Sequence, residues 1–171
     1  MTKKRHESDK YHVSILTSNY DGHGYKKEII DGMTVHRLPI WFKVSNTPIN
    51  LRWYASLKKI FATENPQIVH THSPVPFMAD IAAMAAPKNS AVIATYHSGS
   101  MLKGNFSTDL LIGAYENIFL PKLFKRADAI VAISQEFVKN KFPELAGKTY
   151  FIPTGVDLER FTQTPLPKGD G

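Results

Sequence analysis

The sequence of 171 residues contains no cysteine, which excludes a disulfide framework and any metal site built on thiolates. It also has no apolar run of the ~20 residues that a membrane-spanning helix requires. Residues 1–10 are charged and no apolar stretch follows them, so a secretory signal is not expected. With 43% hydrophobic and 21% charged residues, the composition predicts a globular domain with its own core, located in the cytoplasm.

The charge is not concentrated in any one part of the chain, although its formal net value is +6. Scattered lysines and arginines are typical of solvated helix faces. An anionic membrane surface or a phosphorylated ligand is the partner that such residues would attract. Nucleic acid is not expected as a partner, because no nucleic-acid-binding motif accompanies the charge.

Short apolar segments alternate with helical patterns along most of the chain. Strands are predicted at residues 12–17, 33–38, 67–71, 91–96, 128–133 and 149–152, and helices at 48–63, 75–86, 107–126 and 134–142. Pro121 is expected to kink or split the third helix. Four of the strands are short and apolar and are expected to be buried on both faces, which predicts an α/β fold with a mostly parallel sheet between helices.

Polar residues follow most of the predicted strands. Ligands of an open parallel sheet bind beyond the carboxyl ends of its strands, so these residues are expected to converge on one rim. They include His72 and Ser73, the run from Tyr96 to Ser100, Ser134, and Thr154, Gly155 and Asp157. Among them His97 is the strongest candidate for chemistry, because an imidazole can donate, accept or relay a proton near neutral pH. The alternative is a histidine that only caps the strand.

Several of these residues have a simpler interpretation. His70 and His72 would share one face of a strand, but a metal site needs a third and usually a fourth ligand, and none is placed nearby. His70 can equally be a core histidine with a satisfied hydrogen bond, whereas His72 favours substrate contact. Ser73 and Ser134 are explained by helix capping at least as well as by anion binding.

Four segments resemble glycosyltransferases of family 4, which are retaining enzymes of the GT-B fold. Residues 66–74 (PQIVHTHSP) resemble the family's P-D-hydrophobic-[V/I]-H-x-H segment, and residues 94–98 (ATYHS) its T-x-H segment. Residues 127–134 (ADAIVAIS) resemble its A-D-x-[V/I]-[V/I]-A-[V/I]-S segment. Residues 152–157 (IPTGVD) with Phe161 resemble its I-P-[N/T]-G-[V/I]-D-x-x-x-F segment. The four occur in the family's order across residues 11–161.

This resemblance implies a Rossmann-like three-layer domain that forms the acceptor-binding half of a GT-B enzyme, with the nucleotide-sugar held by a second domain. It implies hexosyl transfer from a UDP- or GDP-sugar, with no metal and no cofactor bound by this half. His97 matches the family's cleft histidine, which is the implied catalytic residue. The implied acceptor contacts are His72, Ser73, Tyr96, Ser98, Gly99, Ser100 and Lys103. The implied hinge and cleft residues are Ser134, Thr154, Gly155 and Asp157.

The chain departs from the family's pattern at both ends. Residues 1–10 resemble the remnant of the family's first helix, so the strand and glycine-rich loop that precede this helix are expected to be absent. Residues 11–157 would form the incomplete domain, and 158–171 the hinge and tail. Without a central first strand, the strand at 12–17 and the strand of His70 would either close up or keep unpaired edges. The isolated chain is therefore expected to be inactive. A metal-dependent hydrolase using His70, His72 and His97, or a non-catalytic partner subunit, are the alternatives.

Overall fold

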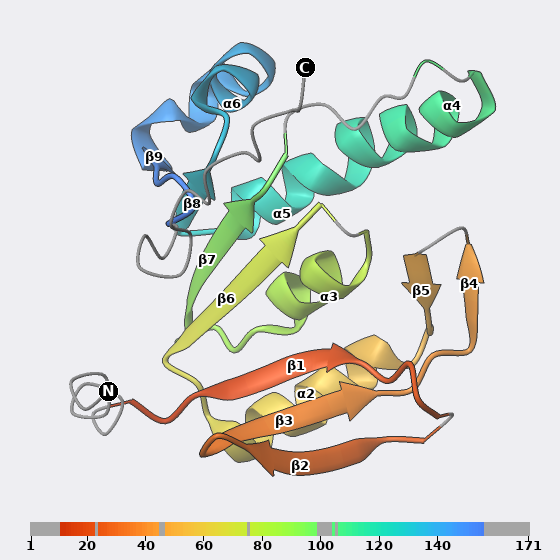
Figure 1. Ribbon diagram of the computed structural model, residues 1–171. Coiled ribbons are helices and arrows are strands. Elements are labelled where there is room, and N and C mark those ends of the chain that lie inside the picture. The colour runs from red at the N-terminus through yellow and green to blue at the C-terminus, as the bar shows by residue number, and fades with distance from the viewer. Residues whose placement is uncertain are drawn as a thin grey trace, which may run out of the picture.

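The computed structural model describes residues 11–22, 24–44, 47–74, 76–98, 104 and 106–155 (Figure 1). The predicted helix remnant at 1–10 and the hinge and tail at 158–171 lie outside these ranges. Within the described residues, helices and strands alternate, which confirms the α/β class. No helix in this part of the chain is both long enough and apolar enough to cross a membrane.

The N-terminal half is built on a mixed three-stranded sheet and one helix. Its strand order is β1-β3-β2, with β1 parallel and β2 antiparallel to β3. The bounds are β1 Ser14–Ser18, β2 Lys26–Ile30, β3 Met33–Leu38 and α2 Trp53–Glu64. A separate two-stranded ribbon, β4 Phe42–Val44 and β5 Thr47–Ile49, leads into α2. Helix α2 lies along one face of the three-stranded sheet in Figure 1.

The C-terminal half is a four-stranded parallel sheet with helices around it. Its order is β6-β7-β8-β9, and every neighbouring pair is parallel. The strands are β6 Ile68–Ser73, β7 Ala91–Tyr96, β8 Ala129–Ala132 and β9 Thr149–Phe151. The helices are α3 Met78–Ala85, α4 Phe106–Ala114, α5 Leu120–Arg126 and α6 Gln135–Lys141, with a 3-10 helix at Pro143–Lys148. A π-helical segment, Tyr115–Phe119, joins α4 to α5, so the long helix is split just before Pro121, as predicted.

Two predicted helix starts were wrong. Pro48 is the middle residue of β5 in the antiparallel ribbon, and α2 begins only at Trp53. Ser73 does not open α3 but is the last residue of β6. The chain turns at Phe77, whose φ of 78° is left-handed, and the backbone N–H of Phe77 donates to the carboxylate of Asp80 at 2.8 Å. The acceptor at the start of α3 is therefore the carboxylate of Asp80 and not the hydroxyl of Ser73.

Strand β2 was missed by the sequence patterns because it lies at a charged, largely exposed sheet edge and has no apolar alternation. A tight turn connects β2 to β3. Asp31 and Gly32 form this turn with φ values of 50° and 81°, the positive values that a tight hairpin needs.

The hydrophobic core extends between α2, α3, α5 and the parallel sheet. Its largest side chains include Trp53 and Phe124, both fully buried. The indole Nε1 of Trp53 donates to the carbonyl of Pro39 at 2.8 Å, so the polar atom of this buried ring is satisfied. Burial of a side chain of this size stabilises the fold by roughly 2–3 kcal/mol.

Strand β6 alternates strictly between its two faces. Val69, Thr71 and Ser73 are buried, whereas Ile68, His70 and His72 are exposed. Because successive side chains of a strand point to opposite faces, one register places both histidines on the outer face and the apolar Val69 inside.

Strands β1 and β6 do not pair with each other, although they lie next to one another in Figure 1. Among the described residues, β1 pairs only with β3 and β6 only with β7. A groove of ≈ 820 Å³ separates them and is lined by residues of both strands. Of the two expected outcomes, closing up or keeping unpaired edges, the structure shows the second.

Candidate functional site

Three histidines from two neighbouring parallel strands stand together near the carboxyl ends of these strands. The ring centroids of His70 and His72 are 4.4 Å apart, and those of His72 and His97 are 5.2 Å apart with nearly parallel planes. Nδ1 of His72 lies 2.9 Å from Nε2 of His97, a hydrogen bond between the two rings. Nε2 of His70 is hydrogen-bonded to the hydroxyl of Thr95 at 2.7 Å.

The backbone explains why these residues meet. His70 and His72 are two positions apart on β6 and share its exposed face. His97 directly follows β7, and its N–H donates to the carbonyl of Ser73 at 2.9 Å, so the ladder between β6 and β7 continues one step beyond the strand. The rim predicted from the polar residues after the strands therefore does bring His72 and His97 together.

The environment of the cluster disfavours positive charge. Partial burial lowers the pKa of the His70 imidazole, and the nearby His72 and His97 lower it further. Burial also lowers the pKa of His72, with His97 as the second cause. Neutral imidazoles at physiological pH can act as both donor and acceptor, whereas imidazolium can only donate. Both rings are therefore suited to hydrogen bonding with uncharged hydroxyl groups.

The bond between His72 and His97 links their tautomers. In the neutral pair one nitrogen must carry the hydrogen and the other must accept it. If Nδ1 of His72 donates, then His97 carries its own hydrogen on Nδ1 and can donate it to a ligand. If Nε2 of His97 donates, its Nδ1 becomes an acceptor. Within the described residues Nδ1 of His97 has no protein partner, so this nitrogen is open to a ligand.

Of the other predicted acceptor contacts that the structure describes, two are buried in the core and one lies next to His97. Tyr96 is fully buried, with its ring stacked on Phe137, and burial raises the pKa of its phenol. Ser73 is also buried, and its hydroxyl donates to the carbonyl of Thr95 at 3.3 Å. These two side chains belong to the core and do not join the histidines. Ser98 is partly exposed next to His97.

Among the predicted hinge and cleft residues, Ser134 is the N-cap of α6, and its hydroxyl accepts from the N–H of Phe137 at 3.4 Å. This is the simpler of the two roles considered for it. Thr154 and Gly155 are exposed beyond β9. Four predicted site residues lie outside the described residues: Gly99, Ser100, Lys103 and Asp157.

The histidine cluster does not have the arrangement of a metal site. Within the part of the chain that the structure describes, no three His, Asp or Glu side chains are placed to hold one ion. One nitrogen of each ring is already engaged: Nδ1 of His72 bonds to Nε2 of His97, and Nε2 of His70 bonds to Thr95. The metal-dependent hydrolase therefore gains no support from these residues.

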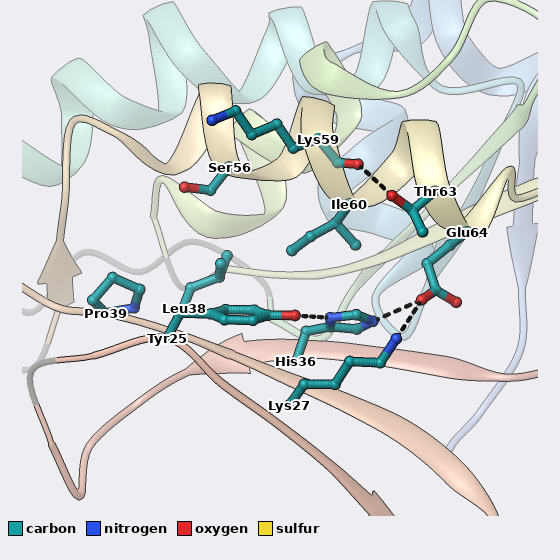
Figure 2. A pocket seen from close by; sticks show the side chains of 10 residues that line it. All are labelled: Tyr25, Lys27, His36, Leu38, Pro39, Ser56, Lys59, Ile60, Thr63 and Glu64. Atoms are coloured by element: carbon teal, nitrogen blue, oxygen red, sulfur yellow. Dashed lines mark hydrogen bonds and ion pairs between the residues drawn. The ribbon is translucent and has the colours of Figure 1, made fainter.

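A second polar cluster, which the sequence did not suggest, lies between the three-stranded sheet and α2 (Figure 2). His36 is buried there, with the hydroxyl of Tyr25 2.7 Å from its Nδ1 and a carboxylate oxygen of Glu64 3.2 Å from its Nε2. The second contact has ion-pair distance but not hydrogen-bond geometry. Because these residues are 11 and 28 positions apart along the chain, no short motif could have signalled them.

Glu64 is the centre of this second cluster. The hydroxyl of Ser14 donates to one of its carboxylate oxygens at 2.8 Å, and the ammonium of Lys27 lies 3.3 Å from the other. The Ser14 hydrogen bond, followed by Lys27, lowers the pKa of Glu64 to about 2. Burial lowers the pKa of His36 in spite of the opposing effect of Glu64. The cluster fastens β1, β2 and β3 to the end of α2, beside a cavity of ≈ 330 Å³.

The fold and the rim together define an α/β protein with polar side chains at the carboxyl ends of a parallel sheet. The chain belongs to Glycosyltransferase Family 4, whose family model matches residues 3–160. None of the curated protein sequences compared with it matches. The histidine cluster and the parallel sheet that carries it both lie inside the matched residues.

Proposed function

We propose that this chain is the acceptor-binding half of a retaining glycosyltransferase that moves a hexosyl group from a UDP- or GDP-sugar to a glycan, lipid or small-molecule acceptor. The observation that carries the proposal is the hydrogen-bonded pair His72 and His97, exposed at the carboxyl ends of two parallel strands in a family 4 domain. Ligands of open parallel sheets bind at this position.

His97 is the proposed catalytic residue. A hydrogen bond from its ring to a sugar hydroxyl would orient the sugar, and it would strengthen as charge develops on the sugar in the transition state. His72 would act on the same bond indirectly, because its hydrogen bond with Nε2 of His97 couples the tautomers of the two rings. His70, held by Thr95, would keep the ring of His72 in place through their 4.4 Å ring contact.

The nucleotide-sugar and the second domain are the partners that this proposal requires. In the family the donor site belongs to a second Rossmann-like domain facing the acceptor half. We therefore expect the 171-residue polypeptide to transfer no sugar when it is assayed alone with UDP- or GDP-hexoses. Measurable transfer by this polypeptide would contradict its assignment as the acceptor half.

Sugar binding can be tested on the chain directly. Glucose, galactose, mannose, N-acetylglucosamine and myo-inositol would each be titrated while the Hε1 resonances of the histidines are followed by NMR. We expect at least one of them to shift the signals of His72 and His97 in a saturable manner, with His36 as the internal control that does not respond.

The matched variants are His97→Ala, which should abolish the response, and His12→Asn, which removes an exposed histidine 3.5 Å from the carboxylate of Glu64 and should leave the response intact. The acceptor role fails if none of the sugars shifts the rim histidines. It also fails if the response survives in the His97→Ala protein.

A further inference from the structure

We propose that the β4–β5 ribbon and the start of α2 form a docking site for an anionic membrane surface. The site consists of the exposed side chains of residues 41–44, 51, 52, 54 and 58, which we call the ribbon patch. None of these residues belongs to the histidine rim, so the proposal does not depend on the sugar site. It rests on the exposed apolar side chains of the patch, on the cations beside them, and on the charge of the segment that carries them.

The ribbon carries apolar side chains on its solvent face. Phe42 and Val44 are two positions apart on β4, so they share one face of the ribbon, and they are 52% and 49% exposed. Pro48, which is opposite Lys43 in the register, belongs to the other face and is buried. Leu51, which follows β5 closely, is 78% exposed. Apolar side chains that gather on a surface in this way mark an interaction site.

Three exposed aromatic rings of this region each have a cation over one face. The pairs are Lys43 over Tyr20 at 4.4 Å, Arg52 over Trp41 at 5.8 Å and Lys58 over Tyr54 at 5.9 Å. The contact between Arg52 and Trp41 joins the start of α2 to the ribbon, so both contribute to one surface. Tryptophan and tyrosine are the side chains that lie at the level of lipid headgroups, where the neighbouring cations would meet the phosphates.

The charge of this segment is entirely positive. Residues 39–59 contain four lysines and arginines and no aspartate or glutamate, whereas the whole chain has 15 acidic residues beside 21 basic ones. Anionic headgroups attract basic residues that stand next to an apolar surface. A bilayer with negative headgroups over acyl chains therefore complements both the charge and the apolar character of the patch.

The ribbon is fixed at its base by buried polar contacts. The side-chain amide of Asn50, which is 2% exposed, donates to the carbonyl of Pro39 at 3.0 Å, and the indole of Trp53 donates to the same carbonyl at 2.8 Å. The backbone N–H of Arg52 donates to Oδ1 of Asn50 at 2.8 Å. These bonds hold the ribbon and α2 in place relative to each other. The apolar side chains are therefore presented by the folded protein, and binding does not first have to order them.

The shape of the patch favours a lipid layer over another protein. Figure 1 shows the β4–β5 ribbon standing apart from both sheets at the edge of the molecule. Neither of the two cavities described above is lined by Trp41, Phe42 or Val44. The anchor residues of protein interfaces fill pockets, whereas side chains that project from a surface can enter the headgroup layer directly.

Docking of the ribbon would also orient the histidine rim. In Figure 1 the arrows of β1, β3 and β6 run toward the side of the molecule on which the ribbon lies. His72 is near the carboxyl end of β6, and His97 follows β7. A bilayer bound by the ribbon patch would therefore lie on the side of the molecule to which the strands direct their carboxyl ends.

Trp41 is a natural reporter for the test. The chain has two tryptophans, of which Trp53 is fully buried and Trp41 is 49% exposed. Vesicles of phosphatidylcholine with about one third phosphatidylglycerol would be compared with vesicles of phosphatidylcholine alone, in sedimentation and with brominated acyl chains. We expect the protein to sediment with the anionic vesicles and its fluorescence to be quenched by the brominated lipid. Trp41→Phe should still sediment but should lose most of the quenching.

One pair of variants tests the apolar part of the patch. Trp41→Ser combined with Phe42→Ser removes two rings from the ribbon, and we expect the partition coefficient to fall by about tenfold for each ring. The control is Tyr150→Ser combined with Phe151→Ser, which removes two rings of similar exposure, 56% and 52%, from β9. This control should bind anionic vesicles like the parent.

A second pair of variants separates the patch from the overall charge. Each cation near an anionic surface raises binding about fivefold, so loss of three should lower the partition coefficient by about a hundredfold. The patch variant combines Lys43→Gln, Arg52→Gln and Lys58→Gln. The control has the same net charge and changes three exposed lysines of α5 and α6, namely Lys122→Gln, Lys125→Gln and Lys139→Gln. We expect the control to lose much less binding than the patch variant.

Sedimentation with anionic vesicles and quenching of Trp41, both lost in the patch variants and kept in the controls, support the proposal. Absence of sedimentation overturns it. Sedimentation without quenching overturns it too, because another surface then binds the vesicles, and so does an equal loss in the patch and control variants. If a patch variant does not fold by circular dichroism, the quenching of the parent protein decides. A dimer in light scattering that shields Trp41 without vesicles would show that a second copy covers the patch, which also contradicts the proposal.

Discussion

The two halves of the molecule use histidine in opposite ways. In the mixed sheet, His36 is buried between Tyr25 and Glu64, and several donors surround the carboxylate of Glu64. At the rim of the parallel sheet, His72 and His97 are exposed and bond mainly to each other. A buried group that loses a partner destabilises the fold, whereas an exposed group that loses one changes stability much less. Partners and burial therefore separate the structural histidine His36 from the two histidines at the rim, which are exposed to a ligand.

The largest effect should come from removing the centre of the buried cluster. Glu64→Ala leaves Ser14, Lys27 and His36 without their shared acceptor, and we expect the free energy of unfolding to fall by about 2–3 kcal/mol. Urea denaturation measures this loss. The control is Glu144→Ala, an exposed glutamate, which should stay within about 0.5 kcal/mol of the parent. A Glu64→Ala protein as stable as the control would contradict the structural role.

A smaller effect is expected at the capping residue on the rim. Ser134→Ala removes the acceptor of the Phe137 N–H and should lower the free energy of unfolding by roughly 0.5–1 kcal/mol. Ser134→Asp keeps a cap and should restore it. If Ser134→Ala instead left stability unchanged and removed the NMR response to sugars, Ser134 would belong to the functional rim and the assignment as a cap would be wrong.

The pH dependence of stability should differ between the clusters. The folded-state pKa values of His70 and His72 lie below the ordinary value of 6.5, so the folded state binds fewer protons than the unfolded state. Their contribution is complete above pH 6.5 and is lost as the pH falls through the folded values. The free energy of unfolding, measured by denaturation at several pH values, should therefore decrease as the pH is lowered from 7.5 to 5.5.

The double variant with His70→Asn and His72→Asn should show a smaller fall over this range. Part of the dependence should remain, because burial lowers the pKa of His36 as well. Glu64 acts in a separate window: its stabilisation is complete above pH 4.5 and is lost between pH 4.5 and about 2. A double variant with an unchanged slope between pH 7.5 and 5.5 would exclude the rim histidines as its source.

The smallest change is in the titration of a single ring. His97 is one cause of the lowered pKa of His72, so in His97→Ala the pKa of His72 should rise toward 6.5. NMR titration of its Hε1 signal measures this shift. His12→Asn, which changes an exposed histidine 3.5 Å from the carboxylate of Glu64, should leave the titration of His72 where it was. An unchanged or lower pKa in His97→Ala would show that burial alone sets the value.

The sequence predicted the parallel sheet well because its strands are short apolar runs between helices. The strand at 91–96 was predicted with its observed bounds, and His72 and His97 were predicted to meet because parallel strands end at one edge. Tyr96 was predicted at the rim but is buried, because the sequence does not show on which face of β7 its ring packs. The cluster of Tyr25, His36 and Glu64 depends on tertiary packing alone.

The alternation along β6 has a consequence for how this domain can vary. His70 and His72 are in phase with each other and out of phase with Val69. A shift of the strand by one residue would turn both imidazoles inward and expose the valine, so the two properties cannot change separately. A length change in the connection before β6 is tolerated only if the strand keeps this phase. The burial of Val69 therefore determines which face of β6 carries the two histidines.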